Sequence, residues 1–410
     1  MSALTQVFVR GHHRYDLDLY AGDLERFAAW LLGKGFSIRT TQTHLFRVRE
    51  VLRSADAEPG ATLELRALRR AFRRLELRQW KYRHTCSTYL RYLRATNHLV
   101  EAVPAPPDYL ELLAREFCQR LERRRGLTRS TVRGYYRSIA DFLRRSLPRS
   151  RSLRDLSRRS LGRYIDTCGP KFAPRTFRCA IRAIQAFLHD CYDRGLLAER
   201  LDVIDLPRGF VPERPPRAMP WPLVENLLES IDRARRTGGR DHAILHLMAY
   251  YGLRTGELTD LTLDSINWRT RTLTVWRAKT RSTTVLPLHD RSLQIIADYL
   301  NSRRPRTDLP YLFLTDCAPR TAMSTSGIGR LFQRRLQQSG LGTSGYSPYS
   351  LRHAFAMRLF QQGVGMKAIG DLMGHRNLIS TSVYLRLQSE ALREVALPVP
   401  RQPPLAEGRA

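Results

Sequence analysis

The sequence predicts a mainly α-helical protein whose C-terminal domain is mixed α+β, with a small β-sheet. Three observations support this fold class. Apolar residues recur at helical spacing through much of residues 1–205. Two short runs rich in β-branched residues, 273–276 and 283–288, have the composition of strands. Pro-rich segments at residues 103–107 and 206–217 separate three regions, and a chain of 410 residues is long enough for two or three domains.

Residues 1–103 are predicted to form an N-terminal helical domain. Leu24, Phe27 and Leu31 fall on one face of a helix that Gly35 ends. Ser37 is expected to cap the next helix, because its hydroxyl can accept a hydrogen bond from a free backbone N–H. A third helix is expected to start near residue 63, and a fourth to cover residues 85–93.

Residues 108–205 are predicted to form a second helical domain, and its sequence echoes the first. The segment from Gly126 to Thr131 aligns without gaps on the segment from Gly35 to Thr40, which lies 91 residues earlier. Apolar positions further along match at the same offset. The pattern indicates either a duplicated helical domain or two helical hairpins that share capping chemistry by chance.

The last third of the chain is predicted to be the mixed α+β domain. A linker at residues 206–220 precedes it, the domain itself covers residues 221–397, and a disordered tail follows at 398–410. The two strand-like runs are expected to pair as a hairpin or small sheet. Helices are expected at residues 241–251, 292–300 and 326–338.

The charge of the chain points to a polyanionic partner. The formal net charge is +31 and the isoelectric point is near 10.9. The basic residues are spread along the chain instead of forming one amphipathic basic segment, which favours nucleic acid over a membrane surface. Within the second domain, we expect the DNA-facing residues to include Arg129, Ser130, Thr131 and Arg133, near a helix N-terminus.

Other features narrow the class of protein. Only five of the 69 basic residues are Lys, a bias that GC-rich coding explains, so a Lys in a chemically suggestive segment stands out. The six Cys residues lack metal-ligand spacing, and we find no phosphate-binding GxxxxGK[ST] loop, so no metal or nucleotide cofactor is expected. No long apolar run or signal peptide is evident, and we expect a cytoplasmic protein.

Five residues of the last domain form a set that could attack a phosphodiester. Two guanidinium groups, from Arg254 and Arg352, could bind its non-bridging oxygens and stabilise their growing charge. Tyr384 is the candidate nucleophile, Lys279 could protonate the leaving 5′ oxygen, and His375 could donate a hydrogen bond to the phosphate. A covalent phosphotyrosine would conserve the bond energy, so the strands could be rejoined without ATP.

The spacing of these residues resembles that of the tyrosine recombinase (phage integrase) family. The matching segments run from Gly252 to Leu258, from Leu351 to Ala356, and from Met373 to Tyr384. The resemblance implies an integrase-like catalytic domain at residues 221–397 and a helical core-binding domain at residues 108–205. It also implies strand exchange on double-stranded DNA through a 3′-phosphotyrosine, usually in a tetramer, here of this chain alone or with related recombinases.

One position departs from the family pattern. The family usually has His three residues before its second Arg, where this chain has Tyr349. Three interpretations follow: Tyr349 donates a hydrogen bond to the phosphate, His353 takes part of the role, or the site is weakened.

The sequence therefore predicts a site-specific DNA recombinase, and the additional N-terminal domain favours an integrase or transposase of a mobile element. Two rival functions are considered. One is an accessory DNA-binding protein that has lost catalysis and assists a partner recombinase. The other is a type IB topoisomerase-like enzyme, which would relax DNA without a partner site.

Overall fold

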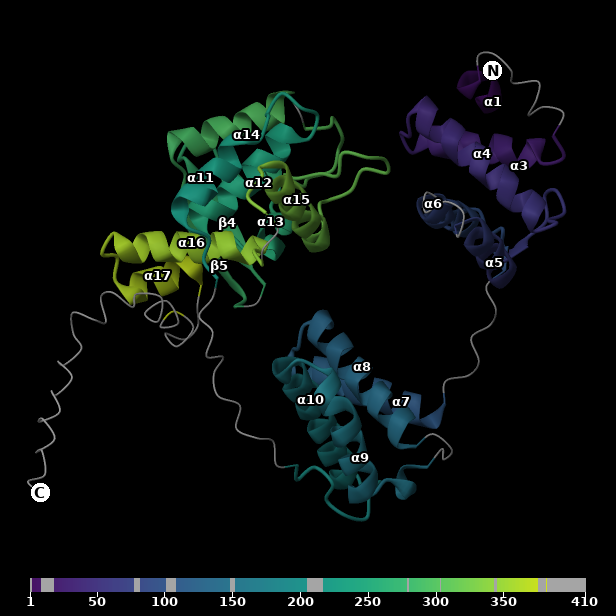
Figure 1. Cartoon of the computed structure of the whole chain (residues 1–410), viewed down its shortest axis with the longest axis vertical. Coiled ribbons are helices and arrows are strands. Elements are labelled where there is room, and N and C mark those ends of the chain that lie inside the picture. The colour runs from purple at the N-terminus through teal and green to yellow at the C-terminus, as the bar shows by residue number, and fades with distance from the viewer. Residues whose placement is uncertain are drawn as a thin grey trace, which may run out of the picture. The chain divides into compact units, whose positions relative to one another are not determined.

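The computed structural model describes residues 2–8, 18–76, 82–100, 108–147, 152–204, 217–278, 280–302, 304–342, 345–374 and 381. The chain divides into two compact units. One holds residues 100–213 together with 64–66, and the other holds residues 1–63, 67–99 and 214–410. The parts are described below one at a time, as three helical sets (Figure 1). The predicted fold class is confirmed, since most elements are helices and strands are few and short.

The first set, here called the N-terminal bundle, spans residues 2–100. It contains α1 (Ala3–Val7), α3 (Ala21–Gly33), α4 (Ile38–Ser54), α5 (Leu65–Glu76) and α6 (Tyr82–Ala95), with a sheet of β1 (Leu63–Glu64) and β2 (Leu99–Val100). Gly35 turns the chain with a positive φ of 76°, which glycine adopts without strain. As predicted, the Ser37 hydroxyl caps α4 by accepting a hydrogen bond from the Thr40 N–H.

The second set, here called the middle bundle, contains four helices. These are α7 (Tyr109–Arg125), α8 (Arg129–Ser146), α9 (Arg158–Cys168) and α10 (Pro174–Asp193), with 3-10 turns η1 (Leu153–Asp155) and η2 (Gly169–Lys171). Its core is apolar and continuous, and the rings of Phe117 and Phe187 pack edge to face with centroids 5.5 Å apart. Burial of this core on one face of each helix explains the helical spacing in the sequence.

The third set, here called the C-terminal unit, is built around α12 (Gly238–Tyr251). Every residue of α12 from Arg240 to Ala249 is buried, and the helix contacts both α14 and α16. The other helices are α11 (Trp221–Glu229), α13 (Thr255–Asp260), α14 (Asp290–Ser302), α15 (Thr325–Gln338), α16 (Pro348–Gln361) and α17 (Met366–Met373), with the 3-10 turn η3 (Leu263–Ser265). Figure 1 shows α16 and α17 side by side, and the two helices are in contact.

An antiparallel sheet in the order β3-β4-β5 completes the C-terminal unit. The strands are β3 (Ile266–Asn267), β4 (Thr272–Arg277) and β5 (Ser282–Pro287). The predicted hairpin is confirmed, with Leu273 opposite Leu286 and Arg277 opposite Ser282. Burial alternates along β4, so that Leu273, Val275 and Arg277 face inward.

Several predictions concern residues outside the described ranges. These are the linker at 103–107, most of the linker at 206–220 and the tail at 398–410. The three domain boundaries placed from the sequence therefore stay predictions. Among the described residues, no helix is long and apolar enough to cross a membrane.

Candidate active site

The two predicted arginines meet at one place in the C-terminal unit. Arg254 lies at the start of α13, just after α12, and Arg352 lies in the first half of α16. Arg352 donates from Nη1 to the Gly252 carbonyl and from Nη2 to the Met373 carbonyl. Arg254 Nη2 donates to the Gly374 carbonyl over 3.4 Å. Both side chains therefore tie the end of α12 to the end of α17.

A buried carboxylate, Glu257, holds the two arginines in register. Its Oε1 accepts from Arg254 Nη1 at 2.7 Å, and its Oε2 accepts from the Arg254 backbone N–H at 2.8 Å. Oε2 also lies 3.9 Å from Arg352 Nη1. Burial alone would lower the pKa of Arg254, but the hydrogen bond and charge of Glu257 raise it above its ordinary value. Arg254 thus stays a cation with a fixed guanidinium plane.

The two arginines differ in their access to solvent. The Arg254 side chain is 19% exposed, whereas that of Arg352 is 2% exposed. Arg254 is the guanidinium that can meet an incoming anion directly. Arg352 instead donates to backbone carbonyls where α12, α16 and α17 meet. Residue type and spacing do not reveal this difference between the two arginines.

Tyr349 lies at the rim of this arginine pair. It is the second residue of α16, after Ser347 at the N-cap and Pro348, and 47% of its surface is exposed. Its phenol is close enough to Arg254 to add a smaller upward contribution to the pKa of that arginine, through a hydrogen bond and charge. The Tyr349 ring also packs on His353, with centroids 5.4 Å apart.

His353 is a poor source of positive charge in this environment. Burial, with a smaller contribution from Arg352, lowers the pKa of His353 from 6.5 to about 4. The imidazole is therefore neutral near pH 7. Its ring packs on the ring of Tyr349, which is the more exposed of the two residues.

A third arginine, Arg277, lies near the pair at the end of α17. It was not predicted from the sequence as a site residue. It is 1% exposed at the end of β4, and its Nη2 donates to the Leu372 carbonyl at the end of α17. Nε and Nη1 have no hydrogen-bond partner among the described residues. Burial lowers the pKa of Arg277, with opposing smaller contributions from Glu257 and Arg254.

Arg277 explains why residue 374 is glycine. Gly374 has a φ of 62°, in the left-handed region, and a Cβ there would lie 2.0 Å from Arg277 Nη1. Gly374 ends α17 and directly precedes the predicted His375. Arg254 and Arg277 therefore both donate to carbonyls at the end of α17, which directly precedes the predicted His375 in the sequence.

Comparisons with known proteins agree on one protein family for this chain. A model of the phage integrase family matches residues 223–391. The putative integrase/recombinase y4gC of Sinorhizobium fredii is 41% identical over 179 residues, covering 43% of this chain and 92% of that protein. The chain belongs to the tyrosine recombinase family. The tyrosine recombinase XerC of Chlamydia pneumoniae is 30% identical over 220 residues, covering 52% of this chain and 68% of XerC.

A solved structure extends the likeness to the fold. The XerH site-specific recombinase bound to its palindromic difH substrate superimposes with a TM-score of 0.56 and 14% identity, covering 70% of this chain and 94% of that one. At that identity the likeness concerns the fold alone. The family resemblance noted from the three sequence segments is confirmed.

The remaining predicted site residues of this chain fall in two groups. Lys279, His375 and Tyr384 lie outside the described residues, although their neighbours Arg277, Thr280 and Gly374 lie inside them. The predicted DNA-facing set lies in the first two turns of α8, and all of its members are exposed: Arg129, Ser130, Thr131 and Arg133. Thr128 caps this helix by accepting from the Thr131 N–H.

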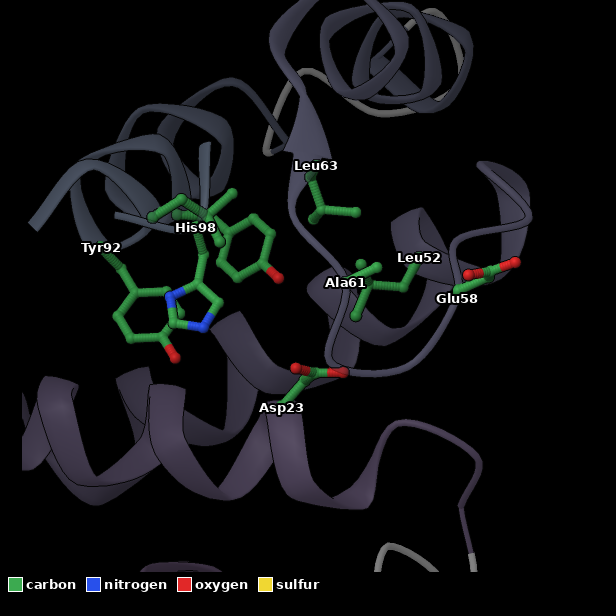
Figure 2. Close-up of a pocket in the computed structure, with 9 residues that line it drawn as sticks. Asp23, Leu52, Glu58, Ala61, Leu63, Tyr92 and His98 are labelled. Carbon is green, nitrogen blue, oxygen red and sulfur yellow. The ribbon is translucent and has the colours of Figure 1, made fainter. Parts of the chain in front are cut away.

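The structure also has a pocket apart from these residues. Figure 2 shows it within the N-terminal bundle, where Asp23, Tyr92 and His98 are among its lining residues. It contains none of the predicted site residues. Among the described residues, no group of three or more His, Cys, Asp or Glu side chains could hold a metal ion.

Proposed function

We propose that the chain is a site-specific DNA recombinase that cuts and rejoins strands through Tyr384. The Tyr384 phenol gives its proton to a base such as water as its oxygen forms a bond to the scissile phosphorus, and the bond from phosphorus to the 5′ oxygen breaks. The leaving oxygen takes a proton from Lys279, and the cut strand stays linked as a 3′-phosphotyrosine. Attack by a 5′ hydroxyl from a partner strand reverses these steps, so no ATP is consumed.

The observation that carries this proposal is the arginine pair around Glu257. Arg254 and Arg352 come from segments far apart in the sequence, and hydrogen bonds hold both at the end of α17. A pair of cations held in place before the substrate arrives can stabilise a phosphate transition state without reorganisation. The segment that follows Gly374 leads to His375 and then Tyr384.

Tyr349 is proposed to replace the usual family histidine as a hydrogen-bond donor. Its phenolic oxygen can accept from Arg254, which leaves the O–H free to donate to a phosphate oxygen. Its exposure and its place at the rim of the pair support this role. The neutral His353 behind it is then a packing partner.

We propose that the substrate is double-stranded DNA and that the chain is the recombinase of a mobile element. The XerH recombinase, whose fold is similar, was solved bound to its difH substrate, and y4gC is a putative integrase/recombinase. The net charge of +31 and the exposed residues at the start of α8 support DNA binding by this chain. We further propose a tetramer on DNA, of this chain or with related recombinases.

A suicide-substrate assay tests the reaction class. A nicked duplex that carries the candidate site, taken from DNA flanking the gene, is incubated with wild type, Tyr384→Phe and Tyr349→Phe proteins. Wild type is expected to form a covalent adduct that Tyr384→Phe abolishes, because the nucleophile is lost. Tyr349→Phe is expected to form it about 10- to 100-fold more slowly, because one phosphate donor is missing.

Two outcomes would contradict the proposal. An adduct that persists in Tyr384→Phe would assign the nucleophile to another residue. Tight binding of wild type to this DNA with no adduct, alone or with related recombinases, would leave a DNA-binding accessory protein instead.

A further inference from the structure

Apart from α1, which has no counterpart in the middle bundle, the N-terminal and middle bundles share one plan of four helices. The helices follow in the same order, α3-α4-α5-α6 and α7-α8-α9-α10. Before the second helix of each set, a glycine with positive φ turns the chain, at Gly35 and at Gly126. A hydroxyl then caps that helix, Ser37 accepting from the Thr40 N–H and Thr128 from the Thr131 N–H. These paired positions all lie 91 residues apart.

The cores of the two bundles match as well. At the same spacing, Val48, Val51 and Leu52 of α4 correspond to Ile139, Phe142 and Leu143 of α8, and all six are buried. An aromatic pair joins the first helix to the fourth in both sets. Phe27 packs on Tyr92 with centroids 5.0 Å apart, and Phe117 packs on Phe187 with centroids 5.5 Å apart. Caps, turns and core positions thus agree at one spacing, and each bundle has an aromatic pair between its first and fourth helices, although not at that spacing. The agreement favours duplication over coincidence.

The third helix is where the copies diverge in charge. In α5, five exposed arginines recur at positions i, i+3, i+4, i+7 and i+8, which places them in one stripe along the helix: Arg66, Arg69, Arg70, Arg73 and Arg74. The opposite face carries Leu68, Ala71 and Phe72, all buried in the bundle. When α9 is aligned on α5 by its buried face, only two stripe positions are basic, Arg159 and Arg163.

Such a stripe is costly without an anionic partner. Like charges three and four residues apart destabilise a helix. The one acidic residue of α5 is Glu76, at its last position, and no ion pair to the stripe occurs among the described residues. A membrane surface is a poor match, because the apolar face of α5 is already buried and cannot enter lipid. A row of guanidinium groups along one helix suits the regularly spaced phosphates of duplex DNA.

We propose that the N-terminal bundle is a second copy of the middle bundle and that the α5 arginine stripe binds the backbone of duplex DNA. Each subunit then holds DNA at two similar modules, one through α8 and one through α5. The proposal rests on DNA being the partner of the chain, but it does not depend on strand cleavage by Tyr384.

The test is the salt dependence of DNA binding by the full-length chain. Wild type and a triple variant, Arg69→Gln, Arg70→Gln and Arg73→Gln, are titrated onto a labelled 50-base-pair duplex of fixed sequence at a series of salt concentrations. The slope of log affinity against log salt is expected to become shallower by about 2.7, since each lost phosphate contact removes about 0.9. The three side chains are exposed, so circular dichroism and the unfolding midpoint are expected to stay as in wild type.

A charge-matched control separates the stripe from net charge. The variant Arg233→Gln, Arg306→Gln, Arg320→Gln removes three exposed arginines from the C-terminal unit and is expected to change the slope by less than one third as much. An unchanged slope in the α5 variant, or an equal change in the control, would overturn the proposal. Adduct formation at Tyr384 is measured in the same preparations, so failure of the cleavage chemistry is recognised separately.

Discussion

At the scale of single residues, Glu257 is the group on which the arginine pair depends. Two guanidinium groups close together repel one another, and burial removes the water that would screen them. Glu257 supplies the opposite charge and also accepts the backbone N–H that begins α13. One carboxylate therefore serves both the helix start and the cationic site.

Replacing Glu257 tests this double role. Glu257→Gln keeps an acceptor but removes the charge, and it is expected to lower the free energy of unfolding by about 2 kcal/mol. This is less than for a fully buried pair, because the Arg254 side chain is 19% exposed. Adduct formation is expected to fall about 100-fold, since Arg254 loses its fixed orientation. Urea denaturation and the suicide substrate provide the two measurements.

The same helix offers a control for this change. Asp260→Asn also removes a carboxylate from α13, but at an exposed position. The rate of adduct formation is expected to stay within about twofold of wild type, and the free energy of unfolding within about 0.5 kcal/mol. Equal effects of the two substitutions would show that Glu257 acts only through the general charge of α13.

Glu257 was within reach of sequence reasoning, whereas the surroundings of Arg352 were not. An acidic residue three positions after a helix start is the pattern of a side chain that reaches back to the first N–H, and Glu257 stands three after Arg254. Arg277 continues the inward alternation of Leu273 and Val275, which signals a buried cation. The carbonyls that Arg352 meets depend on how α12, α16 and α17 pack, and no local pattern encodes that packing.

At the scale of elements, the end of α17 is shaped by a close approach between Gly374 and Arg277. Gly374→Ala is expected to displace Arg277, because the new Cβ would overlap Nη1, and to slow adduct formation about 10-fold or more by shifting the segment that leads to His375. The left-handed φ adds strain of about 1–2 kcal/mol. Single-turnover cleavage of the suicide substrate measures the first effect.

Gly363 provides the matched control, since its φ is 80° and no atom lies within 4 Å of the position that an added Cβ would take. Gly363→Ala is expected to incur the backbone strain and leave cleavage by the folded protein unchanged. If both alanine variants cut equally well, the approach of Arg277 has no part in positioning the site.

The elements themselves were largely predictable. Helices with a strong apolar face, such as those begun by Ser37 and Thr128, appear where spacing and caps place them. The strand β3 escaped prediction because it has two residues, Ile266 and Asn267, too few for alternation to show. It is defined by pairing with Leu273 and Thr272 of β4, which is a tertiary property.

At the scale of the whole molecule, buried histidines make stability depend on pH. Burial lowers the pKa of His44, His242 and His353 to about 4, and that of His246 to about 3. Below pH 6.5 the unfolded chain takes up protons at these sites while the folded chain does not. The stabilisation is therefore complete above pH 6.5 and is lost as the pH falls toward 4.

His246→Gln is expected to flatten this dependence by about 1.4 kcal/mol per pH unit between pH 6.5 and 4, because one proton fewer is bound on unfolding. Denaturant titrations at a series of pH values in that range provide the measurement. His189→Gln removes an exposed histidine of α10 and serves as the comparison. A slope that His246→Gln leaves unchanged would show that this histidine is not neutral in the folded protein.

The hydrogen bonds of the arginine pair also fix when the cationic site is completed during synthesis of the chain. Arg254 and its acceptor Gly374 are separated by 120 residues, and Arg352 and Met373 by 21. A ribosome-bound chain that ends before α17 lacks these acceptors, so its cationic site is incomplete. Under the proposed function, strand cleavage would therefore require that the last part of the polypeptide has been made and folded.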